Sequence, residues 1–223
     1  MLRYLLSSSL SPLKSVKSWA EKTYLAKIVT EISPKSLSGM LQRIGSESEK
    51  QRSVFRSLMK RNEIIAYDTS AMFSYSSVIK LAEFGHNNSD MTLPMIKVIL
   101  VFSRSRNEPC YIRSDPGSIA DIDTLRSSQN DVPLGTLFVM DRGFIDDDNF
   151  DTMDTSGLYF ITPLKRNSKI IDYSCDMKDF FMFRKRAIRY SLKKTGRYDL
   201  HIFEDLLMKA HQGERLLCTD FRG

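Results

Sequence analysis

The sequence predicts an α/β fold: a mixed sheet flanked by helices, with a helical region before it and a β-rich segment after it. Two observations carry this prediction. Between residues 63 and 167, short apolar runs of strand length alternate with stretches of helical periodicity. Residues 1–62 contain no convincing strand pattern, whereas parts of residues 179–194 alternate as antiparallel strands do.

Composition narrows the class of protein. The 223 residues are 42% hydrophobic, and no apolar run approaches the length of a membrane span, so no membrane partner is expected. A net charge of +6 and a pI near 9.2 favour an acidic partner, with nucleic acid as the first candidate. The three cysteines are far apart and lack a C-x-x-C spacing. This pattern argues against a disulfide framework or a zinc site and fits a reducing cytoplasm.

Three helices are expected in the N-terminal region. The first covers residues 18–32 and is broken by Ser33-Pro34, and the second runs from Ser36 to Ile44 and stops at Gly45. The third begins near Ser46, with Glu49 as a capping-box partner. Their basic exposed positions fit either a DNA-binding bundle or a helical cap on the next domain, and both readings stay open.

The central region is expected to contain five strands and two helices. The first helix begins at the N-cap Ser118 and continues to Leu125, and the second begins at the N-cap Asp146 and ends at Asp154 before Gly157. The expected strands are 63–68, 93–104, 108–113, 136–141 and 158–164.

Two of these apolar runs end on an aspartate, Asp68 and Asp141. Ligands in sheets flanked by helices collect beyond the carboxyl ends of the strands, so the two side chains are candidates for one site. Neighbouring carboxylates repel unless a proton or cation lies between them, and their hard oxygen atoms suit Mg²⁺ or Mn²⁺. Each aspartate alone reads more simply as a turn or cap residue.

The segment 179–194 interleaves aromatic with basic residues. Nucleic-acid grooves use cations for phosphates and rings for stacking, although a solvated strand face explains the same pattern. Thr195-Gly196 is the expected turn, residues 200–210 read as strand then helix, and residues 216–219 as a short last strand. The residues expected to contact DNA are Arg142, Lys165, Arg166, Arg184, Lys185, Arg186, Arg189, Lys193 and Lys194.

Several segments, in this order and spacing, resemble the catalytic region of insertion-sequence DDE transposases. They are Leu37–Gly45, Ala66–Ser70, Pro116–Asp121, Val139–Phe144 with Asn149 following, and Tyr159–Asn167. The resemblance implies an RNase H-like core with a β-rich insertion, divided as helical region 1–62, core 63–167, insertion 168–214 and last core strand from 215. Asp68 and Asp141 would be the first two acids of the family's metal-binding triad, holding Mg²⁺ or Mn²⁺.

The resemblance also implies what the protein acts on. The family hydrolyses and joins phosphodiester bonds at the ends of its element, so the expected partners are double-stranded DNA of the terminal repeats and the target. A homodimer in a synaptic complex and a cytoplasmic, nucleoid-associated location belong to the same expectation.

The sequence departs from the family at three places. Ser118 stands where the family usually has Asn, and Asp146 where it often has Ser. The third acid lies in a Tyr-x-x-Arg-x-x-x-Glu helix after the insertion, and this motif is absent, which predicts a C-terminally truncated chain. A transposase and a non-catalytic, DNA-binding or regulatory remnant both remain open, and a host nuclease of the same fold is the third alternative.

Overall fold

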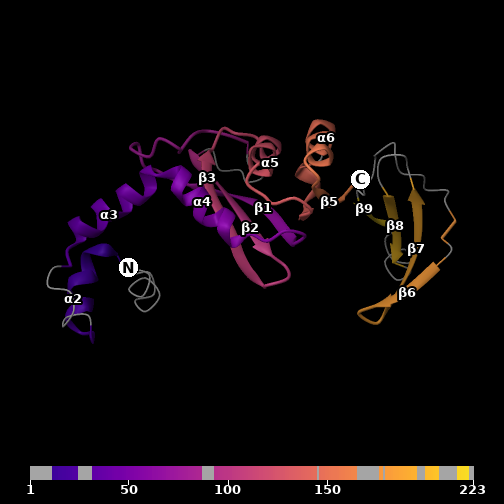
Figure 1. Ribbon diagram of the computed structural model, residues 1–223, viewed down its shortest axis with the longest axis horizontal. Coiled ribbons are helices and arrows are strands. Elements are labelled where there is room, and N and C mark those ends of the chain that lie inside the picture. The colour runs from indigo at the N-terminus through magenta and orange to yellow at the C-terminus, as the bar shows by residue number, and fades with distance from the viewer. Residues whose placement is uncertain are drawn as a thin grey trace. The chain divides into compact units, whose positions relative to one another are not determined.

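The computed structural model describes residues 12–24, 32–86, 93–144, 146–164, 176–177, 179–194, 199–205 and 215–220 (Figure 1). The chain divides into two compact units, Met1–Val54 and Phe55–Gly223. No helix among the described residues is long and apolar enough to cross a membrane.

The N-terminal elements are η1 (Leu13–Ser15), α2 (Val16–Glu21), α3 (Pro34–Ser46) and α4 (Ser48–Leu58), the last of which continues into the second unit. The predicted helix over 18–32 was wrong in its extent, because α2 ends at Glu21; residues 25–31 lie outside the described part of the chain. Ser33 is the N-cap of α3, and Pro34 is its first residue. The Ser33 hydroxyl accepts the Ser36 N–H at 3.0 Å, and proline fits the first helical turn, where no amide donor is needed.

Nine strands form one sheet in the order β3-β2-β1-β4-β5-β9-β8-β7-β6. The two strands on either side of β1 run in different directions: β2 is antiparallel to β1, and β4 is parallel to it. This mixed sheet, flanked by helices, confirms the predicted α/β class. The bounds are β1 (Ile64–Phe73), β2 (Met95–Ser103), β3 (Glu108–Pro116), β4 (Leu137–Met140), β5 (Tyr159–Pro163), β6 (Asp179–Phe183), β7 (Arg186–Lys194), β8 (Asp199–Asp205) and β9 (Arg215–Asp220).

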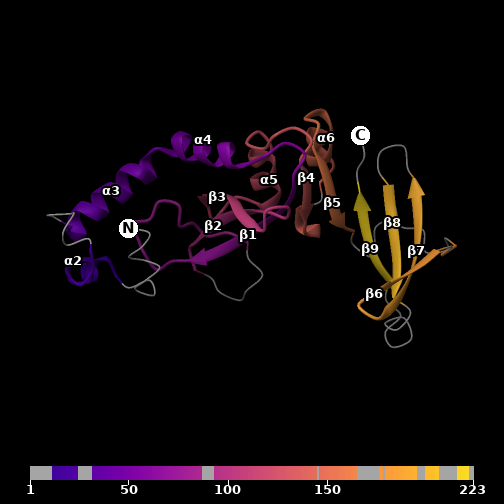
Figure 2. The same cartoon turned by 60° about the horizontal axis from the view of Figure 1, so that its bottom comes forward.

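Helices α5 (Asp121–Gln129) and α6 (Asp147–Thr155) pack beside the central strands (Figure 2). Leu125 of α5 and Met153 of α6 are fully buried in the same core as Ile65 and Phe138. The opposite face of the central strands is more open, with about two fifths of Ile64, Leu100 and Val139 exposed: 41%, 41% and 39%. The sheet therefore has one packed face and one accessible face.

Two predicted caps behave differently from expectation. Ser118 does not cap a helix, because α5 begins at Asp121 and the Ser118 hydroxyl instead donates to Glu83. Asp146 is the N-cap of α6 by position, but its side chain makes no capping bond. Its carboxylate instead accepts from Arg126 at 3.1 Å, joining the start of α6 to α5.

Candidate functional site

Asp68 and Asp141 occupy equivalent places on adjacent parallel strands. Tyr67 and Met140 are the last pair that joins β1 to β4, and each aspartate is the next residue along the chain. In-register side chains of neighbouring strands point to the same face, about 4.8 Å apart across the sheet. Tyr67 and Met140 are buried, whereas both aspartates are exposed. The two aspartates therefore lie on the accessible face of the sheet.

The prediction that both strands end at their aspartate was right to within one residue for β4, which ends at Met140, and wrong for β1. β1 continues for five residues beyond Asp68, to Phe73, because β2 keeps pairing with it as far as Phe73 and Met95. What ends at Asp68 is the pairing with β4. Asp68 therefore lies where two strands separate, which leaves its side chain accessible from the diverging edge.

Asp141 has a defined local environment. The chain turns into the short 3₁₀ helix η3 (Arg142–Phe144), and the Arg142 N–H donates to the Asp141 carboxylate at 2.6 Å. The Thr162 hydroxyl donates to the Asp141 carbonyl oxygen at 3.2 Å, tying the turn to β5. One carboxylate oxygen is thus oriented by the turn, which is the role expected of a capping aspartate, and the side chain remains exposed.

Helix α5 is hydrogen-bonded to β1 at the residues before and after Asp68. The Tyr67 hydroxyl lies 3.2 Å from the Thr124 hydroxyl and 3.3 Å from that of Ser128. On the other side, the Thr69 hydroxyl donates to Asp121 at 2.9 Å, and the buried ammonium of Lys97 pairs with the same carboxylate. Residues 67 and 69 face the core, so these contacts hold β1 from the packed face of the sheet. Asp68 lies on the accessible face.

This group of polar contacts between α5, β1 and β2 was not predicted from the sequence, although one signal for it was present. Lys97 interrupts the apolar run of β2, and its side chain is only 7% exposed. A buried lysine requires a carboxylate partner. That requirement pointed to a nearby acid, but not to Asp121 in particular.

The donor set can be compared with what a divalent cation needs. Two exposed carboxylates on adjacent strands supply hard oxygen atoms of the kind that Mg²⁺ and Mn²⁺ prefer. Among the residues whose placement is described, no group of three or more His, Cys, Asp or Glu side chains gathers around a common point. The pair therefore fits as part of a metal site, and the described residues provide no third acid for it.

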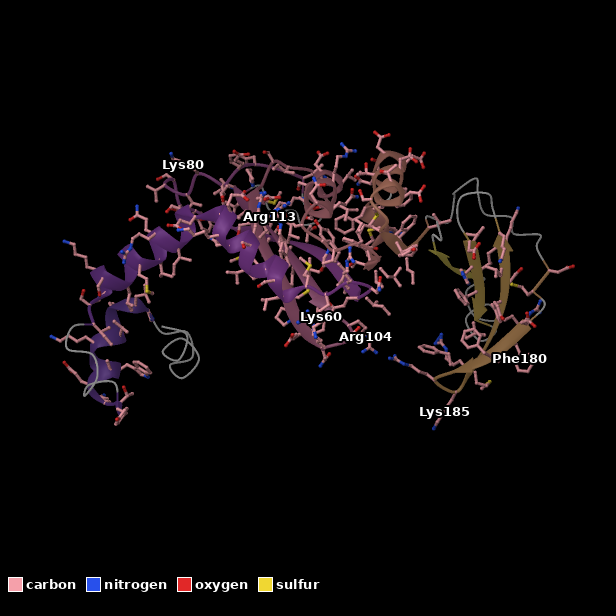
Figure 3. The ribbon with its side chains drawn as sticks, viewed as in Figure 1. Lys60, Lys80, Arg104, Arg113, Phe180 and Lys185 are labelled. Carbon is pink, nitrogen blue, oxygen red and sulfur yellow. The ribbon has the colours of Figure 1, made fainter. Side chains whose placement is uncertain are left out.

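The β6–β7 hairpin places a basic turn at its tip. Arg184 and Lys185 form a two-residue loop with φ of 48° and 64°, the left-handed conformation of a type I′ turn. This turn was not predicted from the sequence, because the two central residues of a type I′ turn are usually Asn-Gly. All five residues of β6 are exposed, and the Arg184 guanidinium lies 5.3 Å from the Phe183 ring centre. Figure 3 shows Phe180 and Lys185 on this hairpin.

Strand pairing divides the other basic residues of the hairpin between two faces. Arg186 and Lys194 share the face of Ile188, whereas Arg189 and Lys193 lie on the opposite face. Only the consecutive residues Arg184, Lys185 and Arg186 come together, at the tip. The predicted interleaved basic and aromatic groove is therefore not formed by β7 alone.

Aromatic rings gather on one face of this part of the sheet. Phe181, Tyr190 and Phe203 have ring centres 5.9–6.3 Å apart, and His201 stacks on Phe203. They line an open cavity of about 540 Å³ together with Asp179 and Phe180. Its rings are accessible for stacking.

The remaining predicted contacts are Arg142, Lys165 and Arg166. Arg142 is exposed and directly follows Asp141, so it is the predicted cation nearest in sequence to the acidic pair. Lys165 and Arg166 lie outside the described residues.

Comparison with known proteins identifies the class to which this fold and site belong. Residues 65–217 match the family described as the transposase DDE domain, which covers more than half of the chain and includes both Asp68 and Asp141. The chain belongs to this family. Families of this type act with divalent metals. No curated protein sequence matches the chain.

Similar solved structures include two transposases and an endonuclease. A piggyBac transposase synaptic complex with hairpin DNA has 8% identity and a TM-score of 0.47, covering 74% of this chain and 35% of that one. The Mos1 transposase paired-end complex has 13% identity and a TM-score of 0.28, with 71% and 56% covered. Ciona intestinalis endonuclease V with an inosine-containing DNA has 13% identity and a TM-score of 0.25, with 56% and 58% covered. This chain therefore spans about a third to three fifths of the length of these proteins.

Proposed function

We propose that the chain acts on double-stranded DNA in transposition, by metal-dependent hydrolysis and transfer of phosphodiester bonds, with Asp68 and Asp141 as two of the metal-binding acids. The observation that carries the proposal is the register of the two aspartates inside a matched transposase DDE domain. Mg²⁺ or Mn²⁺ is the proposed cofactor, and the element's terminal repeats and the target are the proposed DNA partners. A synaptic homodimer and a nucleoid-associated, cytoplasmic location are part of the same proposal.

Each described residue has a limited and definable part in this function. Asp68 and Asp141 would hold the cation, which when bound stabilises charge on the phosphate and on the attacking and leaving oxygen atoms. The Arg142 N–H orients one oxygen of Asp141, and the contacts of α5 with Tyr67 and Thr69 hold the backbone at Asp68. Arg142 would contact a DNA phosphate beside the acids.

The proposal is tested first by metal binding, which does not depend on activity. We expect Mn²⁺ binding to the full chain, measured by electron paramagnetic resonance, to weaken at least tenfold in Asp68→Asn and in Asp141→Asn. Asp154→Asn is the control, because Asp154 is an exposed acid of α6 outside the strand register. Equal binding by all four proteins would overturn the assignment of the acidic pair.

Cleavage and joining of DNA carrying the element's ends is the second measurement. We expect the chain to bind this DNA and to transfer strands in Mg²⁺ or Mn²⁺ only where a carboxylate outside the described residues completes the acidic pair, because the described residues supply two acids and not three. Robust transfer that is abolished by Asp141→Asn would show that a further carboxylate completes the site. Metal-independent transfer would contradict the proposed chemistry.

The β6–β7 hairpin is the proposed DNA contact of the insertion. Its basic tip keeps two non-glycine residues in the left-handed region, where L-residues cost roughly 1–2 kcal/mol each. Strain of this kind persists where it serves a purpose, and here it presents Arg184 and Lys185 at an exposed end. Binding through such phosphate contacts is sequence-tolerant and strongly salt-dependent.

A further inference from the structure

A second group of basic residues lies at the end of the sheet where β1 begins, away from the acidic pair. Lys60 and Arg61 come from the turn between α4 and β1, and Arg104 comes from the turn between β2 and β3. All three side chains are exposed. Figure 3 shows the labelled side chains of Lys60 and Arg104 at the same end of the second unit. We call these three residues the basic end.

The buried carboxylate of Glu63 brings the two turns together. It accepts the Lys60 N–H at 3.3 Å and the Arg106 Nε–H at 2.9 Å, and the Ser103 hydroxyl also donates to it. The Arg104 N–H donates to the carbonyl oxygen of Ile64 at 2.9 Å, so the second turn is bonded directly to the start of β1. The basic end is therefore built on a fixed support and not on two independent loops.

The two carboxylates at this end, Glu63 and Glu108, already have an ion-pair partner. Arg106 pairs with both Glu63 and Glu108, which leaves no acid for the basic end to pair with among the residues described there. In the described part of residues 55–164 there are ten Lys and Arg side chains, of which five form ion pairs. Three of the other five make up the basic end. The five without an ion pair are Lys60, Arg61, Lys80, Arg104 and Arg142.

We propose that the basic end binds the phosphate backbone of double-stranded DNA at a place separate from the acidic pair. Unpaired cations held together on a rigid support are what phosphate contacts require, and they position DNA without reading its sequence. The inference rests on the proposed function, because DNA is already expected at the acidic pair.

The strand sets the separation between the two places. Ile64 and Asp68 are four residue steps apart along β1, or about 13 Å at 3.3 Å per residue. Along a duplex this corresponds to about four base pairs at 3.4 Å each. The basic end therefore cannot hold the phosphate that lies at Asp68, and it adds independent contacts.

The test compares two double variants that lose the same charge. Lys60→Gln/Arg104→Gln removes two cations of the basic end, whereas Lys50→Gln/Arg52→Gln removes two cations that already pair with Glu47 and Glu49. Binding of the full chain to a 30-base-pair duplex is measured by fluorescence anisotropy over a range of salt concentrations. We expect the first variant to reduce the slope of log affinity against log salt by about 1.8, or about 0.9 for each phosphate contact, and the second to leave it unchanged.

Other outcomes separate the inference from the proposed function. A normal slope in Lys60→Gln/Arg104→Gln, together with a reduced slope in Arg184→Ala/Lys185→Ala, would overturn the basic end and leave the proposed function standing. Absence of duplex binding by the unaltered chain at low salt would overturn both. The charge-keeping variant Lys60→Arg/Arg104→Lys should retain the slope, which excludes misfolding as the cause of a loss. Loss of binding to an acidic polypeptide, but not to the duplex, would assign the basic end to a protein partner and overturn the inference.

Discussion

The buried ammonium of Lys97 in β2 pairs with the carboxylate of Asp121 at the start of α5, and the Thr69 hydroxyl donates to the same oxygen. One acid thus joins α5 to the two strands beneath Asp68. We expect Asp121→Asn to lower the free energy of unfolding by about 2 kcal/mol, which is less than for a fully buried pair because Asp121 is 43% exposed. Urea unfolding measures the change.

Replacing the lysine provides the control for this prediction. Lys97→Met keeps most of the side-chain volume and leaves no unpaired buried charge, so it should cost less than Asp121→Asn. The double variant should be close to Lys97→Met alone. A smaller loss in Asp121→Asn than in Lys97→Met would show that the pair does not hold α5 on the sheet.

The hairpin tip offers a way to separate stability from DNA binding. Arg184→Asn/Lys185→Gly introduces the residues that a type I′ turn favours, and we expect it to stabilise the hairpin by about 1 kcal/mol. The same change removes two cations and should weaken DNA binding. Hydrogen exchange of the β6 and β7 amides reports stability, and fluorescence anisotropy reports affinity. Arg184→Ala/Lys185→Ala should lose the same affinity without gaining stability, and unchanged affinity in both variants would exclude the tip as a DNA contact.

The Glu63 support should make stability depend on pH in the acidic range. The guanidinium of Arg106 holds the pKa of Glu63 below its ordinary value of 4.5. A depressed carboxyl pKa contributes stability that is complete above the ordinary value and is lost as pH falls through the folded value. In urea unfolding, the stability lost in Glu63→Gln relative to the unaltered chain should therefore be largest near neutral pH and should shrink below pH 4.5. A difference that stays constant with pH would contradict this role of the ionised carboxylate.

Gly117 lies where the segment before β2 meets the end of β3. A Cβ at this position would overlap the carbonyl oxygens of Met95 and Glu83, which are backbone atoms and cannot rotate away. We expect Gly117→Ala to reduce the melting temperature by several degrees, as a cost of about 1–3 kcal/mol implies. Gly143→Ala is the control, since a Cβ there meets nothing within 4 Å. Equal melting temperatures for the two variants would contradict the close packing at Gly117.

The order of strands and helices in the central region was predictable because each element has its own local sequence pattern. The apolar runs around Ile65 and Phe138 have strand length and end at polar residues, so their nature can be read without knowing their neighbours. The bounds were less accurate where a neighbour extends an element. β1 continues past Asp68 because β2 supplies hydrogen-bond partners, and α5 begins at Asp121 because Ser118 is bonded to Glu83.

By itself, the sequence determined the mixed α/β class and singled out Asp68 and Asp141, since both end apolar runs within segments that resemble one family. Only the tertiary structure decided which charges are free and which are paired. Lys97 and Arg106 are buried in ion pairs, whereas Lys60 and Arg104 are exposed, although the sequence presents all four simply as basic residues. The difference arises because each ion pair joins residues far apart in the chain, Lys97 to Asp121 and Arg106 to Glu63, and only folding brings them together.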